Sequence, residues 1–308
     1  MNTTTSRPSD TSDTSDTADA PRSHQPSYRF QERLRVRWSE IDSQHIVFNA
    51  HYLTYVDTAI AGYWRALALP YHAAMALLEG DVYLKKTTVE YHASAVYEDL
   101  LSIGLRCKHL GTSSMVFDAA IMRGDTLLTS IELVYVFADP RTQTSKPIPD
   151  VLRQLINGYE AGADVVQLRM GGWDVLREAA SEVRTAVFVQ EQGISREDEW
   201  DDMDVPSVHA VLVNALGQPL ATGRLLPSVA GQAKVGRMAA CRVLRGSGMG
   251  SRILHALCDA ARARGDHEVL LHAQTSAQGF YAKLGFQVVG ASFMEAGIEH
   301  VTMSKRLG

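Results

Sequence analysis

A glycine-rich segment in the second half of the chain has the residue types that bind an anion. It reads Arg245-Gly246-Ser247-Gly248-Met249-Gly250. A strand-like apolar stretch precedes it, and apolar residues at helical spacing follow it. Glycines at a helix start let backbone amides approach a ligand closely, and the helix dipole favours a negative charge there. The segment predicts a site for an anion such as pyrophosphate. The alternative is a flexible turn between a strand and a helix.

A second segment, in the first half, places a carboxylate shortly before a long helix. Asp42 ends a strand-like stretch, and a short loop leads from it to the helix. The carboxylate could activate water or attack a carbonyl carbon directly, while amides at the helix start stabilise an oxyanion. Around this reaction we expect His45, Val47, Asn49 and Tyr52. The alternative is structural, with Asp42 forming a turn and Asn49 capping the helix.

Two further carboxylates lie near this segment in the sequence. Glu40 is two residues before Asp42, so on a strand both side chains would point to the same side. Close carboxylates raise the pKa of one of the pair, and we expect Glu40 to be solvated at the edge. Asp57, on the predicted helix, is expected to face solvent or an interface.

The second half also offers a phenol and three candidate bases. Tyr281 could protonate a leaving group, and the alternative is a half-buried core aromatic whose hydroxyl finds water. Glu191, His209 and His272 are candidate general bases, and a base must reach the acceptor within hydrogen-bond distance.

A histidine and cysteine set in the second half raises the question of a metal. Its members are His255, Cys258, His267 and His272. Their spacing follows no recognised zinc pattern, so we expect no metal.

The periodicity of the first half predicts one long helix and several antiparallel strands. Apolar and polar residues alternate from Phe30 to Trp38, and apolar residues recur at helical spacing over about 49–67, where Pro70 then prevents continuation. Further strands are predicted over 82–97, 100–110 and 114–137, with turns at 111–112 and 124–125, before a helix over 151–159. This order favours a sheet wrapped around a helix.

After a junction at 160–163 the pattern changes to mixed α/β. Helices are predicted over 173–191, 250–264 and 277–284, and strands over 208–214, 220–226, 234–241 and 268–273. The fold class is therefore α+β. We expect one domain at residues 28–160 and a second at 165–308.

Composition narrows the class of protein. The 308 residues suit two domains of about 150 residues each. A net charge of -5 argues against a nucleic-acid binder, and no apolar run reaches the roughly 20 residues of a membrane helix. Three cysteines form no disulfide framework, which predicts a reducing, cytoplasmic location. Residues 1–27 are rich in Ser, Asp and Thr, and we expect a disordered tail.

The second half, over about 165–307, resembles the GNAT acyltransferase superfamily. The cofactor loop of that family reads Arg/Gln-x-x-Gly-x-Gly/Ala, and Arg245, Gly248 and Gly250 match it. The resemblance implies that acetyl-CoA or another acyl-CoA contacts this loop together with Met238 and Ala240. It also implies that Tyr281, within Phe280-Tyr281-Ala282-Lys283-Leu284-Gly285-Phe286, protonates the departing thiolate.

Other stretches resemble the ElaA-like branch of that superfamily. They are Arg184-x-x-Val187-Phe188-Val189-x-Glu191-Gln192, His272-Ala273-Gln274 and Gly297-Ile298-x-His300. Arg184, Phe188 and the acidic run over 198–204 also resemble acyl-homoserine-lactone synthases, which share the GNAT fold. The intact Arg-x-x-Gly-x-Gly loop favours an ordinary coenzyme A user.

The first half, over about 28–159, resembles the 4-hydroxybenzoyl-CoA thioesterase family of hotdog proteins. Asp42, Ile46, Val47, Phe48 and Tyr52 match the order of its active-site segment. Later matches are Val89-Glu90-Tyr91-His92 and Tyr97-Glu98-Asp99. The resemblance implies a hotdog fold, a catalytic role for Asp42 and pairing of the sheet edge and long helix into a homodimer or homotetramer. His45 departs from the family, which usually has glycine there, and this leaves substrate and activity open.

Together these features predict a bifunctional enzyme. The first domain would hydrolyse acyl-CoA thioesters, and the second would transfer an acyl group from coenzyme A to an amine. The alternative is a GNAT acyltransferase whose hotdog domain is a non-catalytic scaffold for dimerisation and acyl binding. Asp42 and the helix start favour the enzyme, whereas His45 favours the scaffold.

Overall fold

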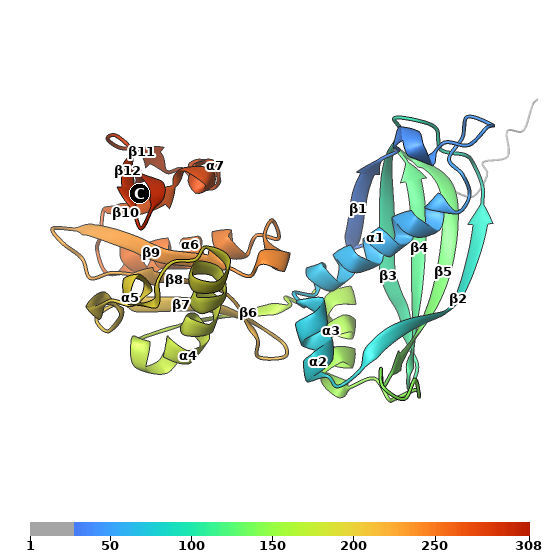
Figure 1. Cartoon of the computed structure of the whole chain (residues 1–308), viewed down its shortest axis with the longest axis horizontal. Coiled ribbons are helices and arrows are strands. Elements are labelled where there is room, and N and C mark those ends of the chain that lie inside the picture. Colours follow the sequence, from blue (N-terminus) through green and yellow to red (C-terminus); the bar gives the residue numbers. More distant parts are fainter. Residues whose placement is uncertain (1–27) are drawn as a thin grey trace, which may run out of the picture.

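The computed structural model describes residues 28–308 and contains two sheets in two lobes (Figure 1). We call residues 28–160 the first lobe and residues 165–308 the second lobe. The predicted fold class is confirmed, because an antiparallel sheet around a long helix is followed by a mixed α/β unit. The tail predicted over residues 1–27 lies outside the described residues.

The first lobe is a five-stranded antiparallel sheet packed on helix α1 (His51–Ala66) (Figure 1). The strand order is β1-β3-β4-β5-β2. The strands are β1 (Phe30–Arg35), β2 (Asp81–Tyr91), β3 (Leu100–Leu110), β4 (Ser114–Arg123) and β5 (Thr126–Ala138). Apolar residues three and four apart form one stripe of α1, so Val56, Ala59 and Tyr63 are fully buried against the sheet.

Local differences from the prediction occur in three connections of the first lobe. The first strand ends at Arg35, and Trp38–Glu40 forms a 3-10 turn. Strand β2 ends at Tyr91 rather than at residue 97. An additional helix, α2 (Tyr71–Leu77), begins directly after Pro70, because the fixed φ of proline suits a helix start as well as a stop. Helix α3 (Asp150–Glu160) closes the lobe.

The second lobe is an eight-stranded mixed sheet, in which seven strands follow the order β11-β13-β10-β9-β8-β7-β6 and β12 pairs with β13 outside this order. Its strands are β6 (Val166–Gly171), β7 (Val208–Asn214), β8 (Pro219–Leu225), β9 (Gln232–Ala240), β10 (Glu268–Gln274), β11 (Gln287–Val288), β12 (Phe293–Glu295) and β13 (Ile298–Arg306). The pairing of β9 with β10 is parallel, and the other pairings among the described residues are antiparallel. Strand β6 was not predicted.

Helices cover both faces of this sheet (Figure 1). Helix α6 (Met249–Ala263) buries Ile253 and Leu257 in the larger core, whereas α4 (Trp173–Arg184) packs Leu176 on the other face. The helix predicted over 173–191 continues past α4 as a π-helical turn, Thr185–Glu191. Short helices α5 (Arg196–Glu199) and α7 (Gln278–Lys283) complete the lobe.

The lobes are joined by polar contacts at the end of α1. Asn214 Nδ2 donates a hydrogen bond of 3.0 Å to the carbonyl oxygen of Ala68, which is fully buried. Asp164, in the connection between the lobes, forms a two-pronged ion pair with Arg252 of α6 at 2.7 and 2.9 Å. Within residues 28–308, no helix is both long enough and apolar enough to span a membrane.

Candidate active sites

The loop around Asp42 is closed by its own backbone. The Asp42 amide donates to the Ile46 carbonyl at 2.9 Å, and the His45 amide donates to the Asp42 carbonyl at 3.0 Å. Ile41 and Val47 form an antiparallel bridge at the base. His45 has a φ of 61°, in the left-handed region, where glycine is favoured. This positive φ explains why the 4-hydroxybenzoyl-CoA thioesterase family, which the first half resembles, usually has glycine at this position.

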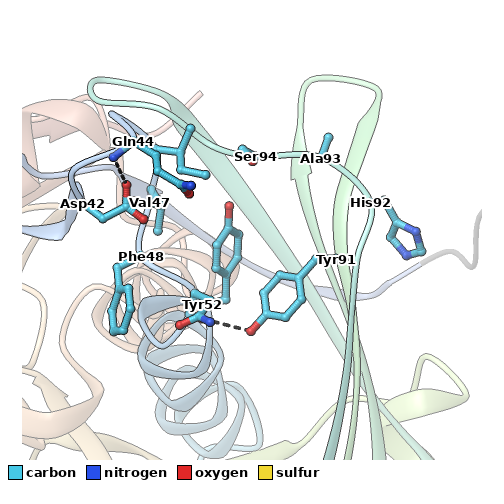
Figure 2. A pocket seen from close by; sticks show the side chains of 11 residues that line it. Asp42, Gln44, Val47, Phe48, Tyr52, Tyr91, His92, Ala93 and Ser94 are labelled. Atoms are coloured by element: carbon cyan, nitrogen blue, oxygen red, sulfur yellow. Dashed lines mark hydrogen bonds between the residues drawn. The ribbon is translucent and has the colours of Figure 1, made fainter.

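Asp42 lines a cavity of about 420 Å³ beside the start of α1 (Figure 2). Val47, Asn49 and Tyr52 line it as predicted, whereas His45 does not. One oxygen of Asp42 accepts the Gln44 amide at 2.8 Å, as in an Asx turn. Asp42 therefore forms a turn and also lines the cavity, because its second carboxylate oxygen takes no part in the turn.

Aromatic rings form the wall of this cavity next to α1. Tyr91 of β2 packs edge-on against Tyr52, with ring centroids 5.5 Å apart. The Tyr91 hydroxyl donates to the Asn49 carbonyl at 3.1 Å, and the Tyr52 hydroxyl accepts the Ala95 amide at 2.9 Å. Tyr91 was not predicted as a site residue, because its place depends on the pairing of β2 in the sheet.

The start of α1 presents free backbone donors. Among residues 28–308, the amides of Asn49, Ala50 and Tyr52 have no hydrogen-bond acceptor. The Val47 amide, by contrast, donates to the Ala95 carbonyl at 2.9 Å. The N-cap position is Ala50 and carries no side-chain cap, so the alternative in which Asn49 caps the helix is wrong. Free amides at a helix start can stabilise an oxyanion.

The prediction that Glu40 is solvated at the edge is wrong. Its side chain is buried rather than solvated, because the 3-10 turn directs it inward. It accepts hydrogen bonds of 2.7 Å from the Tyr55 hydroxyl, the Arg37 amide and the Arg37 Nε. Burial alone would raise the pKa of Glu40, but these hydrogen bonds outweigh it and hold the pKa below its usual value. Glu40 therefore supports the loop, and Asp57 is exposed as expected.

The glycine loop of the second lobe is the candidate anion cradle. Gly246 and Gly248 have φ values of 84° and 85°, and Gly248 is the N-cap of α6. Within the described part of the chain, no acceptor is found for the amides of Gly246, Gly248, Met249 and Gly250. A Cβ atom on Gly250 would lie 3.2 Å from the Phe280 ring. Converging free amides at a helix start bind phosphate groups.

The side chain of Arg245 joins this loop to the π-helical turn. Its terminal nitrogens bind both carboxylate oxygens of Glu191 at 2.6 and 2.7 Å. Hydrogen bonding to Arg245 holds the pKa of Glu191 below its usual value, which makes the carboxylate a weaker base. Glu191, which was predicted as a candidate base, thus lies beside the glycine loop and is bound by Arg245.

Strands β9 and β10 separate next to the glycine loop. Their parallel pairing stops at Val235 and Leu271, although both strands continue. Arg237 has a φ of 51° at a register shift between β8 and β9, and such bulges redirect a strand. Met238 and Ala240 follow on β9, so their backbone edge facing β10 is unpaired. We call this unpaired region the gap between β9 and β10; an unpaired strand edge can bind an extended ligand.

The remaining candidates of the second lobe differ in burial. Tyr281 is buried in the core beside α6, and burial raises its pKa to about 12. The hydroxyl therefore stays protonated at neutral pH. His209 is buried against Trp173, with ring centroids 4.8 Å apart, and burial lowers its pKa. His272, on β10, remains partly exposed.

The acidic run over 198–204 has a structural explanation. Its residues Glu199 and Asp204 are buried and pair with Arg184, which is also buried. Asp204 binds Arg224 as well, at 2.7 Å. Buried charges require such partners, so these residues stabilise the interior of the second lobe. Within residues 28–308, no group of three or more His, Cys, Asp or Glu side chains could hold a metal ion.

Comparisons with known proteins agree with this division of the chain. The model of the acetyltransferase (GNAT) domain matches residues 181–307, and that of the thioesterase superfamily matches residues 44–130. The protein YyaT of Bacillus subtilis is 38% identical over 130 residues, which cover 42% of this chain and 87% of YyaT. The uncharacterised N-acetyltransferase YjcF of the same organism is 36% identical over 124 residues, covering 40% of this chain and 87% of YjcF.

A solved structure is similar to part of this chain. The crystal structure of a 1,4-dihydroxy-2-naphthoyl-CoA thioesterase from Synechocystis superimposes with a TM-score of 0.40 at 16% identity. The match covers 42% of this chain and 97% of that chain.

Proposed function

We propose that this chain acts on acyl-CoA thioesters at two sites. It belongs to the GNAT acetyltransferase family through its second lobe, and it carries a thioesterase-superfamily domain in its first lobe. The first lobe would hydrolyse the thioester, and the second would transfer its acyl group to an amine. We take residues 28–160 and 165–308 as the two domains. The three free cysteines support a reducing, cytoplasmic location.

The observation that carries this proposal is the row of free amides at the start of α6. Gly246, Gly248, Met249 and Gly250 offer four donors without a competing acceptor in the described residues. These donors suit the pyrophosphate of coenzyme A. The gap between β9 and β10 would hold its extended arm, with Met238 and Ala240 on one side. Tyr281 would then protonate the thiolate that leaves.

The hydrolytic proposal rests on Asp42 and the start of α1. The free amides of Asn49, Ala50 and Tyr52 at the start of α1 would bind the developing oxyanion. Asn49 and Tyr52 line the same cavity as Asp42. Asp42 would take a proton from the attacking water, and the carbon–sulfur bond would break to release coenzyme A. An edge strand such as β2 favours pairing with a second copy, so we propose a homodimer or homotetramer.

The scaffold function is the second candidate. The Asx turn that occupies one oxygen of Asp42 and the bulky His45 in its loop favour it. In that case the first lobe would bind acyl groups and hold the assembly together without hydrolysing thioesters.

Two substitutions in the full chain distinguish these functions. Hydrolysis is measured as free thiol released from short, long and aromatic acyl-CoA esters without amine, and transfer as acylated product with a panel of amines. We expect Asp42→Asn to lower hydrolysis about 100-fold and preserve transfer. Tyr281→Phe should lower transfer about 100-fold and preserve hydrolysis.

The outcomes of these assays distinguish the two candidate functions and test whether the sites are independent. Wild-type chain that transfers but releases no thiol without amine would establish the scaffold. Loss of both activities in either variant would contradict independent sites.

A further inference from the structure

His272 is the least engaged of the three candidate bases. It lies on β10 between Leu271 and Ala273, which are buried in the core with α6. Because side chains alternate along a strand, His272 projects from the opposite face, and its side chain is 33% exposed. His209 is buried, and Glu191 is bound by Arg245. His272 alone therefore combines exposure with an uncommitted ring nitrogen.

A carboxylate from a distant hairpin holds the His272 ring. Glu295 of β12 places Oε2 at 3.1 Å from Nδ1 of His272, and Phe293 of the same strand packs edge-on against the ring at 4.9 Å. A carboxylate only accepts hydrogen bonds, and its contact is shorter than the 3.5 Å contact of Lys234 Nζ with the same nitrogen, so we assign the hydrogen to Nδ1. The neutral ring then has its lone pair on Nε2, for which no partner is found among the described residues.

Other charged groups surround the ring. Lys234 of β9 places its Nζ 3.5 Å from Nδ1, so it faces the same edge as Glu295 and leaves Nε2 clear. His300 of β13 stacks on Phe293, with ring centroids 6.0 Å apart. The local set thus contains one carboxylate, one ammonium and two imidazoles.

His272 also stands where the thioester is proposed to lie. The parallel pairing of β9 and β10 stops at Leu271, one residue before His272. Two residues further, Gln274 donates at 3.0 Å to Gln192, which follows the turn that ends at Glu191. The ring is therefore at the start of the gap between the strands, on the face that carries the π-helical turn.

We propose that His272 is the general base of the transfer reaction and that Glu295 is the residue that positions it. This assignment rests on the proposed transferase function. A neutral amine attacks the thioester carbonyl carbon, the carbon–nitrogen bond forms and the carbon–sulfur bond breaks. One N–H proton passes to Nε2 of His272, and the Tyr281 hydroxyl protonates the sulfur. Solvent then takes the imidazolium proton and returns one to the phenolate.

The test uses the full chain and counts the acylated amine by mass spectrometry, so hydrolysis in the first lobe does not contribute. We expect His272→Gln to lower kcat about 100-fold or more, with the KM for acetyl-CoA little changed. Glu295→Gln retains an acceptor for Nδ1–H but removes the charge, and should lower kcat roughly tenfold.

The split between kcat and KM, together with rescue by the conservative variant, separates positioning from a merely structural role. Glu295→Gln should lower kcat without raising the KM for acetyl-CoA, and Glu295→Asp, which keeps the charge, should restore kcat in part. The matched control is Glu299→Gln, an exposed carboxylate on the same hairpin, which should change neither kcat nor KM.

The possible failures are distinct. If wild-type chain acylates no amine, the proposed function fails, and this inference fails with it. If wild-type chain is active but His272→Gln keeps its kcat, only the assignment of His272 is overturned. If Glu295→Gln and Glu299→Gln behave alike, the positioning role of Glu295 is overturned.

Discussion

His45 occupies a backbone conformation that its side chain disfavours. A φ of 61° strains the folded state of a residue with a Cβ atom by about 1–2 kcal/mol. Glycine avoids this strain, but its greater freedom in the unfolded chain lowers the free energy of unfolding by about 0.5–1 kcal/mol. We predict that His45→Gly raises the free energy of unfolding by up to about 1 kcal/mol and changes hydrolysis less than tenfold. Urea denaturation measures the first and thiol release the second.

Gln44→Gly is the matched control for His45, because Gln44 is also exposed and is not among the residues with positive φ. It should lower the free energy of unfolding by about 0.5–1 kcal/mol. Equal effects of the two substitutions would contradict strain at His45.

Glu40 links the loop to the core through a buried carboxylate. Removing its charge weakens the hydrogen bonds from Arg37 and Tyr55, so Glu40→Gln should cost about 1–3 kcal/mol at neutral pH. The folded-state pKa is lowered, so this stability is present above the unfolded pKa of about 4.3. It is lost as pH falls through the folded value. Denaturant titrations of both proteins from pH 7 to pH 3 should converge, and a constant difference would contradict the prediction.

Helix α6 has a glycine with a positive φ at each end. Gly248 begins it with a φ of 85°, and Gly265 follows it with a φ of 91°. Valine is strained at either position, but only Gly248 belongs to the anion cradle. We predict that Gly248→Val raises the KM for acetyl-CoA in transfer at least tenfold, since about 1.4 kcal/mol is a factor of ten.

Gly265→Val separates strain from binding. It should lower thermal stability to a similar extent and leave the KM for acetyl-CoA within about twofold. An equal rise of KM in both variants would mean that the helix as a whole, rather than the loop, controls affinity.

The whole chain is predicted to assemble through the first lobe. Strand β2 is an edge of its sheet, with Leu84 52% exposed on it, and unpaired edges favour strand addition. Light scattering at micromolar concentration should give at least a dimer. Leu84→Glu places repelling charges at the proposed contact and should shift the mass toward the monomer.

Leu77→Glu is the control for assembly, because Leu77 is equally exposed but lies on α2. It should leave the mass unchanged. A wild-type monomer would contradict assembly through β2.

The sequence alone determined the features that depend on neighbouring residues. The stripe of α1 is set by apolar spacing, and the observed helix differs from the predicted range of 49–67 by two residues at its start and one at its end. Gly246 and Gly248 adopt the positive φ that their residue type allows. Alternation predicted strands β7 and β8 to within one residue at each end. These are local preferences, so a short window of residues carries the information.

Tertiary structure decided which side chains meet. Glu40 was expected in solvent, but the turn at Trp38–Glu40 directs it to Tyr55. Glu191 is 54 residues from Arg245, its partner. Glu295 reaches His272 only because the β12–β13 hairpin pairs beside β10. Such contacts depend on strand order and register, which arise from packing between distant segments, and no local pattern of residue types records them.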